Sequence, residues 1–461
     1  MAKIFIAFYN AISQENTFDH AIPCFYEAFI AELLNLGNEL LIIHHNKFVG
    51  NYDPIPTSIK NEIANFSPDL AILFNNAFFD IASIFEFPIY IYEVDSIINF
   101  SNLETLKQKK DRFKYIVSQT SSIELIQKVI GVKKEDIFYM PFFTSIRKEK
   151  LPKIMNISFI GTRFCTEDSE GSSVWSKFMQ TEPSEASIKL FKEALEIVKK
   201  DPFSSQEILE KNIYSFDENI KKYIDNSTLI DVLSGCNRIL TLSEISDLGL
   251  TIFGTKSWAY ENSIDYNIPL SFNFSKIYSL KHNQDIYNSS KIAININHLQ
   301  AKTGFSWRVC DIMASDACLV SEYKPDFDIL FPKLQIPVFH DRYTGRALCK
   351  KILKNEHMRQ DIVSQCNEII EKKFRLKHYI KDLEIFFAIS LNTKDKKGTS
   401  LIKFYNFYRN NHPKILTKTK VKCKLIGALL LLILTQVPGM RNLLPHQKQK
   451  YIIKKVYQFF N

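Results

Sequence analysis

The chain has 461 residues, 46% of them hydrophobic, and a formal net charge of +9 at neutral pH. Single hydrophobic cores stop growing well below this length, so we expect two domains rather than one. The positive charge is confined to the end of the chain, because residues 401–461 contain twelve Lys or Arg and no Asp or Glu. Residues 1–400 hold 47 basic and 50 acidic residues, a balance that argues against a nucleic-acid groove and a nucleic-acid partner.

The cysteines and the first residues indicate a cytoplasmic or cytoplasm-facing protein. Eight cysteines are scattered without a Cys-x-x-Cys pair, so neither a disulfide framework nor a zinc site is indicated. Residues 1–10 become polar too soon for a signal peptide and are better interpreted as a first buried strand.

The first 150 residues alternate between apolar runs and segments with helical spacing. Five runs have the length of strands: residues 4–8, 40–43, 70–74, 88–92 and 115–117. Between the first two, apolar side chains from Tyr26 to Leu34 repeat with helical periodicity. Strands that alternate with helices predict a parallel sheet covered on both faces, so residues 1–150 are expected to form a Rossmann-like domain.

A second series of strands and helices occupies residues 151–376. Its apolar runs begin at Ile157, Leu250, Ile292, Cys318 and Val338. Residues of about 166–236 have mainly helical spacing and exceed what one crossover needs, so we interpret them as a helical insert. A helical stretch over about 343–373 closes this second Rossmann-like domain.

Residues 394–461 differ in character from the rest of the chain. Residues 394–400 have the composition of a linker, and the lysines after them lead into ten apolar residues, 425–434. This run is well short of the ~20 residues that span a bilayer. An apolar centre with positive flanks is typical of an in-plane anchor, so we expect a helical tail in which residues 401–461 bind an anionic membrane surface. The alternative is a tail that docks on the body of the protein or on another copy of it.

Residues 304–321 are the most informative stretch, with the pattern of a loop, a helix and a short buried strand. Arg308 and Asp311 are one helical turn apart, so they share a face near the predicted helix start. An arginine can bind a diphosphate through two parallel hydrogen bonds, and a carboxylate one turn along can accept from ribose hydroxyls. The pair suits a nucleotide-diphosphate donor, although an Arg–Asp pair on a solvated helix face fits the spacing equally well.

Further segments occur in a recognisable order around this stretch: residues 156–162, 250–258, 287–297, 330–341 and 354–359. Together with Gly304, Arg308 and Asp311 they resemble the GT-B glycosyltransferases, and most closely the CgeB-like, spore-maturation-type branch (glycosyl transferases group 1). The resemblance covers roughly residues 154–390. It implies two Rossmann-like domains facing across a cleft, with a helix in residues 377–393 crossing back to the first domain. Asp311 and Asp316 depart from the family, which usually has Glu and Gly there.

The resemblance also implies which residues bind the substrates. The expected donor-binding residues are Arg308, Asp311, Gly304, Gly161, Thr162, Arg163, Asn297 and His298. On the acceptor side, Asp95 follows the fourth strand of the first domain, where the family often carries an acidic residue that can act as a general base. Asp19 and His20, in the loop after the first strand, are further catalytic candidates. Each of these three also fits a helix cap or a surface position.

Asp326-Phe327-Asp328 superficially matches the metal-binding motif of another glycosyltransferase architecture, GT-A. It follows Lys324-Pro325 and precedes an apolar triplet, a context that predicts a turn into a short helix. We therefore expect no metal site, and no cofactor besides the nucleotide-diphosphate sugar that serves as donor substrate.

The sequence thus favours a metal-independent glycosyltransferase that moves a sugar from a nucleotide-diphosphate sugar to a glycan or lipid-linked acceptor, in bacterial surface polysaccharide or glycoconjugate synthesis. Its expected location is peripheral, on the inner face of the cytoplasmic membrane. Two alternatives share the fold: a non-catalytic protein that binds sugar nucleotides or acts as a scaffold, and an isomerase, which needs no acceptor.

Overall fold

A computed structural model describes residues 1–405 except for 11–21, 47–54, 76, 98–99, 101–102, 165–183, 187, 190–225, 261–266, 276–278 and 393–396. Residues Met1–Tyr405 form one compact unit, and Asn406–Asn461 form a second unit that lies outside the described residues. The expected apolar tail and most of the expected helical insert therefore lie outside the described part of the chain. No helix among the described residues combines the length and hydrophobicity that crossing a membrane requires.

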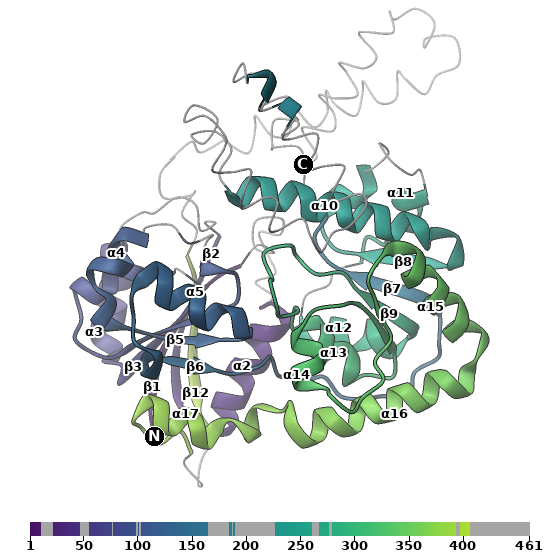
Figure 1. Cartoon of the computed structure of the whole chain (residues 1–461). Helices are drawn as coiled ribbons and strands as arrows, with labels where there is room; N and C mark the ends of the chain where they lie inside the picture. Colours follow the sequence, from purple (N-terminus) through teal and green to yellow (C-terminus); the bar gives the residue numbers. More distant parts are fainter. Residues whose placement is uncertain are drawn as a thin grey trace, which may run out of the picture. The chain divides into compact units, whose positions relative to one another are not determined.

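The first sheet has seven parallel strands in the order β12-β2-β1-β3-β4-β5-β6 (Figure 1). The strands are β1 (Lys3–Tyr9), β2 (Glu39–His45), β3 (Leu70–Phe74), β4 (Ile89–Glu93), β5 (Phe113–Val117), β6 (Ile137–Tyr139) and β12 (Thr399–Tyr405). The helices between them are α2 (Cys24–Asn35), α3 (Thr57–Phe66), α4 (Leu103–Gln108) and α5 (Thr120–Ile130), with short 3₁₀ helices η1 (Phe79–Ser83), η3 (Lys110–Arg112) and η4 (Lys134–Asp136). Inner strands such as β3 are apolar and buried throughout, because a parallel sheet is covered on both faces.

Strand β12 corrects the expected linker and tail. Residues 394–400 were predicted to be a linker and 394–461 a helical tail, but Thr399–Tyr405 pairs in parallel with β2 along seven residues. Gly398 permits this pairing, since a Cβ there would lie 2.0 Å from the carbonyl oxygen of Asn38. Half of the strand is exposed, as befits an edge strand, so it lacks the continuous apolar run that marks the inner strands.

The second sheet has five parallel strands in the order β11-β10-β9-β7-β8. They are β7 (Met155–Ile160), β8 (Leu250–Phe253), β9 (Ser290–Asn295), β10 (Cys318–Glu322) and β11 (Val338–Phe339). The associated helices are α10 (Asn226–Glu244), α11 (Asn267–Ser271), α12 (Leu280–Asn288), α13 (Arg308–Met313), α14 (Asp326–Leu330), α15 (Arg342–Lys354) and α16 (Glu356–Lys373), with 3₁₀ helices η5 (Ser246–Leu248) and η6 (Lys256–Tyr260). The predicted α/β class with two Rossmann-like domains is therefore confirmed.

After α16 the chain returns to the first sheet. A 3₁₀ turn, η7 (Leu376–His378), leads into α17 (Ile380–Phe387), which packs on β4 and β6. The ring of Tyr90 lies 4.4 Å from that of Phe387, and the Tyr90 hydroxyl donates to the carbonyl of Phe386 at 3.3 Å. In Figure 1, α16 runs beneath the second half toward α17, which lies below the first sheet.

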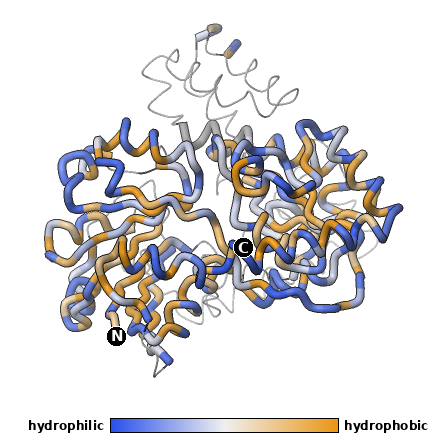
Figure 2. The backbone as a smooth tube through the Cα atoms, turned by 60° about the horizontal axis from the view of Figure 1, so that its bottom comes forward, coloured by the Kyte–Doolittle hydropathy of each residue, from blue (hydrophilic) through white to orange (hydrophobic). Residues whose placement is uncertain are grey.

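Both halves bury their strands between helices. Hydrophobic stretches gather in the interior of each half, while hydrophilic segments lie mainly on the outer helices and turns (Figure 2). Among the described residues, Trp258 is the largest fully buried side chain, and its indole N–H donates to the carbonyl of Gly161 at 2.8 Å. This bond fixes the turn at the carboxyl end of β7, where the candidate site begins.

Candidate active site

Arg308 begins α13 and lies against the carboxyl end of β9. Its Nη2 donates to the carbonyl of Ile296 at 3.2 Å, and its Nε donates to Asn295 Oδ1 at 3.4 Å. The guanidinium carbon is 6.0 Å from the centre of the Phe159 ring on neighbouring β7. Because α13 has only six residues, the guanidinium is a stronger candidate for anion binding here than the helix end.

A second arginine, Arg238 on α10, reaches the same carbonyl. Its Nη2 donates to Ile296 at 3.3 Å, and its Nη1 donates to the carbonyl of Thr162 at 2.6 Å. Two guanidinium groups that converge on one carbonyl concentrate positive charge, which favours an anionic ligand. Arg238 was not among the residues predicted from the sequence. The one feature of the sequence that could point to Arg238 is its place as a lone arginine beside apolar residues such as Ile239, which α10 buries.

The loop after β7 brings the predicted residues Gly161, Thr162 and Arg163 to this place. The Gly161 N–H donates to Phe253 on β8 at 2.9 Å, and the Thr162 carbonyl binds Arg238. Gly254 permits the close approach, because a Cβ there would lie 2.0 Å from the Gly161 carbonyl oxygen and its φ is +154°. Arg163 is 6% exposed, so a third guanidinium belongs to this loop.

Asn297 and His298 follow β9 directly. The Asn297 N–H donates to Glu322 Oε2 at 2.7 Å, and its Oδ1 accepts from the Ser306 N–H at 3.2 Å. Burial raises the pKa of Glu322, which lies at the end of β10. The His298 ring packs edge-on against Phe164 at 4.4 Å. Asn297 thus holds the site's framework together, and His298 lines the same loop as Arg163.

Asp311 lies in a different environment from the ribose-facing one that the sequence suggested. It is 2% exposed, and its Oδ1 accepts from the Thr144 hydroxyl at 2.6 Å while the Cys24 thiol approaches Oδ2 at 3.6 Å. Burial is the main reason that its pKa rises to about 7. The carboxylate therefore joins α13 to α2 and to residues 140–154, the segment between the two sheets.

Gly304 also differs from its expected role beside phosphate. A Cβ at this position would lie 2.4 Å from the Cβ of Gln119, just before α5 of the first half. The Gly304 N–H donates to Gln119 Oε1 at 3.3 Å. The glycine therefore lets the two halves of the molecule approach each other.

Asp95 follows β4, at the carboxyl edge of the first sheet. Its Oδ2 accepts from Asn75 Nδ2 at 2.8 Å, and its Oδ1 accepts from Gln300 Nε2 at 2.7 Å. Asn75 Oδ1 also accepts hydrogen bonds from the main-chain N–H groups of Val94 and Asp95, both at 2.9 Å. The backbone of Asn75 has a φ of +56°, which is uncommon for a non-glycine residue. The loop is thus tightly held. The other two catalytic candidates, Asp19 and His20, lie outside the described residues.

Glu93, the last residue of β4, is a second carboxylate next to this loop and is not among the residues predicted from the sequence. It is 3% exposed, and its Oε1 accepts from the Ile97 N–H at 2.9 Å. Burial raises the pKa of Glu93 to about 7. A carboxyl group with such a pKa can exchange protons near neutral pH, so Glu93 is an additional proton-transfer candidate.

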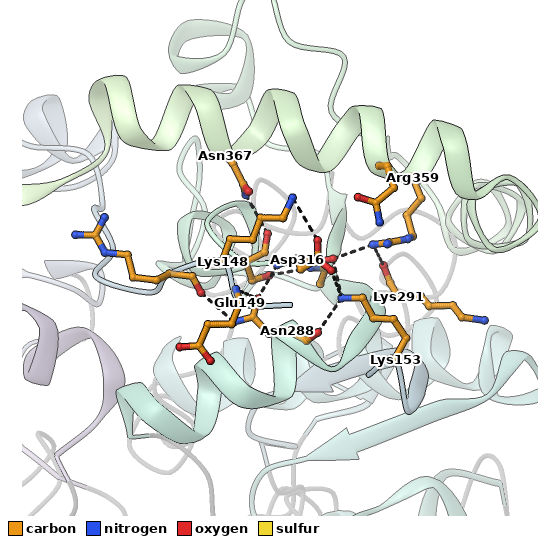
Figure 3. A network of polar contacts seen from close by, with 12 residues as sticks. Lys148, Glu149, Lys153, Asn288, Lys291, Asp316, Arg359 and Asn367 are labelled. Atoms are coloured by element: carbon orange, nitrogen blue, oxygen red, sulfur yellow. Dashed lines mark hydrogen bonds and ion pairs between the residues drawn. The ribbon is translucent and has the colours of Figure 1, made fainter. Parts of the chain in front are cut away.

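Asp316 binds cations other than Arg238 and Arg308, the two residues called the arginine cluster below. Its carboxylate binds Lys148 Nζ at 3.3 Å and Lys153 Nζ at 2.7 Å, and its carbonyl accepts from Arg359 Nη1 at 2.8 Å (Figure 3). The Asp316 N–H donates to Asn288 Oδ1 at 2.8 Å. The Asp316 side chain therefore ties the segment between the two sheets to the second half.

Asp326 and Asp328 lie on the short helix α14, as the sequence predicted. Asp326 accepts from the Thr120 hydroxyl at 2.6 Å and from the Thr120 N–H at 3.1 Å, which links α14 to α5. Asp328 accepts from the Tyr323 hydroxyl at 2.6 Å. Among the described residues, no group of three or more His, Cys, Asp or Glu side chains is arranged to hold a metal ion.

Comparison with known families places a glycosyl transferase-like sequence in this part of the chain. Residues 238–384 match the family model described as glycosyl transferase-like. The match begins at Arg238 and includes Arg308 and α13. No curated protein shows a significant match to the chain.

Several solved structures share a distant structural likeness with the chain. Phage T4 β-glucosyltransferase, solved with UDP and Mn²⁺, is 13% identical with a TM-score of 0.47, over 84% of this chain and 100% of that one. Anabaena HepE, solved with UDP and glucose, is 10% identical with a TM-score of 0.43, over 84% and 100%. A glycosyltransferase from Rickettsia africae is 12% identical with a TM-score of 0.40, over 84% and 97%.

Proposed function

We propose that the chain is a GT-B glycosyltransferase of the CgeB-like type that moves a sugar from a nucleotide-diphosphate sugar to a hydroxyl of a glycan or lipid-linked acceptor. The convergence of Arg238 and Arg308 on the Ile296 carbonyl carries the proposal. These guanidinium groups lie at the carboxyl ends of parallel strands, the usual place for ligands in such sheets. The glycosyl transferase-like match, which contains both arginines, supports the same reading.

The chemistry follows from where charge develops. The bond between the sugar C1 and the diphosphate oxygen breaks, and its electron pair leaves with the nucleoside diphosphate. Arg238 and Arg308 stabilise that charge, a term that commonly supplies a large share of catalysis. A bond forms between C1 and the acceptor oxygen, whose proton passes to the Asp95 carboxylate. Asp95 is our choice of base because its loop meets the second half through Gln300.

The wider setting is also part of the proposal. We place the reaction in bacterial surface polysaccharide or glycoconjugate synthesis, without a metal cofactor, at the inner face of the cytoplasmic membrane. The basic composition of residues 401–461 supports attraction to anionic lipid headgroups.

The test is turnover of a panel of UDP-, GDP- and dTDP-sugars. Turnover is measured as release of the nucleoside diphosphate. The wild-type chain should release it from at least one sugar nucleotide, and Arg308→Ala should lose most of that rate. Lys350→Ala removes an exposed cation from α15 and serves as the matched control. Binding without release in the wild type would instead indicate a non-catalytic sugar-nucleotide-binding protein.

A further inference from the structure

The carboxamide of Gln300 bridges the two halves of the molecule at Asp95. Its Nε2 donates to Asp95 Oδ1 at 2.7 Å, and its Oε1 accepts from the Ser96 N–H at 3.2 Å. One side chain of the second half therefore holds both the carboxylate and the main chain of the loop after β4. A bidentate contact fixes orientation as well as distance.

Asp95 is held on both sides by neutral groups. Asn75 binds its Oδ2 at 2.8 Å, and Gln300 binds its Oδ1. Within the described part of the chain, no lysine or arginine forms an ion pair with this carboxylate. Amide donors set the plane of a carboxylate without cancelling its charge, and each oxygen keeps further lone-pair capacity for an acceptor hydroxyl.

The segment that carries Gln300 also begins at the arginine cluster. Gln300 is four residues after Ile296, whose carbonyl accepts from Arg238 and Arg308. Between them, the Leu299 N–H donates to Ser234 Oγ on α10 at 3.0 Å. The path from the donor-side guanidinium groups to Asp95 is therefore one short, hydrogen-bonded stretch of main chain.

The far end of the same segment is fastened to the first half. The N–H groups of Lys302 and Gly304 approach Gln119 Oε1 at 3.2 and 3.3 Å. The Ser121 N–H donates to Thr303 Oγ1 at 3.0 Å. These contacts attach the segment without Gln300, so its side chain is not needed to keep the halves together.

We propose that Gln300 is a positioning residue that orients Asp95 toward the acceptor hydroxyl and links that orientation to the donor side of the site. This role rests on the function proposed above. Substrate binding at the arginine cluster and proton acceptance at Asp95 then depend on one segment, residues 296–304. Loss of the Gln300 carboxamide should impair the chemical step and spare donor binding, since orientation of a reacting group acts mainly on the barrier.

The experiment compares Gln300→Ala and Gln300→Glu with wild type. The assay is hydrolysis of the sugar nucleotide that the wild type turns over fastest, with water as acceptor. Gln300→Ala should lower kcat by about 10- to 100-fold, with the donor KM within about twofold. Gln300→Glu should be at least as slow, because it sets a second carboxylate against Asp95. Lys302→Ala is the matched control on the same segment, since its contact uses the main-chain N–H.

The outcomes separate the two proposals. An unchanged kcat in Gln300→Ala would overturn the positioning role while leaving the proposed function intact. A donor KM that rises in step with the fall in kcat, together with a lower Tm, would show that Gln300 only packs the segment. If the wild type turns over no sugar nucleotide, the proposed function fails and the role of Gln300 fails with it.

Discussion

Arg238 and Arg308 come from different helices and donate to one carbonyl oxygen, that of Ile296. The strand end thus acts as a common anchor for two cations. The two residues are not equivalent, because Arg238 is 2% exposed whereas Arg308 is partly exposed at the start of α13. Their separate contributions to binding and to folding can therefore be measured.

Arg308→Ala should reduce kcat/KM by the equivalent of about 2–4 kcal/mol, as removal of an anion-stabilising donor does elsewhere. Its Tm should change little. Arg238→Ala should reduce kcat/KM similarly, but it should also lower the free energy of unfolding by about 1–3 kcal/mol, because the Thr162 carbonyl loses its arginine donor and the Ile296 carbonyl keeps only Arg308. Steady-state kinetics and urea unfolding distinguish the variants. Arg308→Ala with wild-type kcat/KM would remove the donor-site assignment.

Asp311→Asn tests whether this carboxylate is an interior group. Burial raises its pKa from 3.8 to about 7, so the folded protein holds the proton more tightly than the unfolded chain. The contribution of the Asp311 carboxyl group to the free energy of unfolding is fully present below about pH 4 and is lost as the pH rises to about 7. The Asn variant lacks this titration, so its free energy of unfolding relative to wild type should rise by about 4 kcal/mol between acidic and weakly alkaline pH.

Urea unfolding at pH 4, 6 and 8 measures this difference. Asp111→Asn, at an exposed aspartate of η3, is the matched control and should follow wild type at each pH. Parallel curves for wild type and Asp311→Asn would contradict the interior role. If the unfolding curves are parallel and Asp311→Asn also raises the donor KM, the result would support the ribose-binding role that the sequence predicts for Asp311.

Asp316→Ala should lower the free energy of unfolding by about 1–3 kcal/mol, because it leaves Lys153 without its carboxylate. Burial already lowers the pKa of Lys153, so this ammonium depends on its partner. Lys148→Ala should cost less than about 1 kcal/mol, since that partner is more exposed. Chemical denaturation measures both. If Asp316→Ala and Lys148→Ala lower the free energy of unfolding equally, the segment between the two sheets is held by contacts other than the Asp316–Lys153 pair.

Activity should persist in EDTA. Guanidinium groups, rather than a metal ion, are proposed to take the charge of the leaving diphosphate, and Asp326 is already engaged by Thr120. The measurement is nucleoside diphosphate release before and after chelation. Loss of the rate with recovery on Mn²⁺ or Mg²⁺ would show that the reaction uses a divalent ion.

Deletion of residues 406–461 should abolish sedimentation with anionic vesicles while nucleotide binding is kept. Each basic residue near such a surface is worth roughly 1 kcal/mol, and the effect falls within a Debye length. The deletion has to begin after Tyr405, because β12 belongs to the first sheet. High salt should release full-length protein only in part, since the apolar run adds a salt-insensitive share. Identical partitioning of both forms would indicate a docking or oligomerisation tail.

The inner strands are predictable because each is a short apolar run that must be covered on both faces. Strand β12 is not predictable in the same way, since Leu401 and Ile402 are about half exposed and a basic stretch follows. An edge strand in a polar context has no periodicity that distinguishes it from a linker.

The candidate site is predictable in part. Arg308 follows from motif order, but the partners of Asp311 are 167 and 287 residues away, and the Gln300–Asp95 contact joins residues 205 apart. Spacing along a helix shows which side chains share a face, and it does not show what that face meets. Arg238 illustrates the same limit, because only the fold brings α10 beside β9.

Strand β12 has a consequence for biosynthesis. The outer edge of β2 is complete only when residues 399–405 have emerged from the ribosome, after the whole second half has been made. At about 5–20 residues per second, that edge stays open for on the order of tens of seconds. A nascent chain with an unpaired edge strand can pair with its neighbours on a polysome. A fragment ending near residue 150 would carry this exposed edge permanently, so aggregation rather than independent folding is the expected fate of the first half alone.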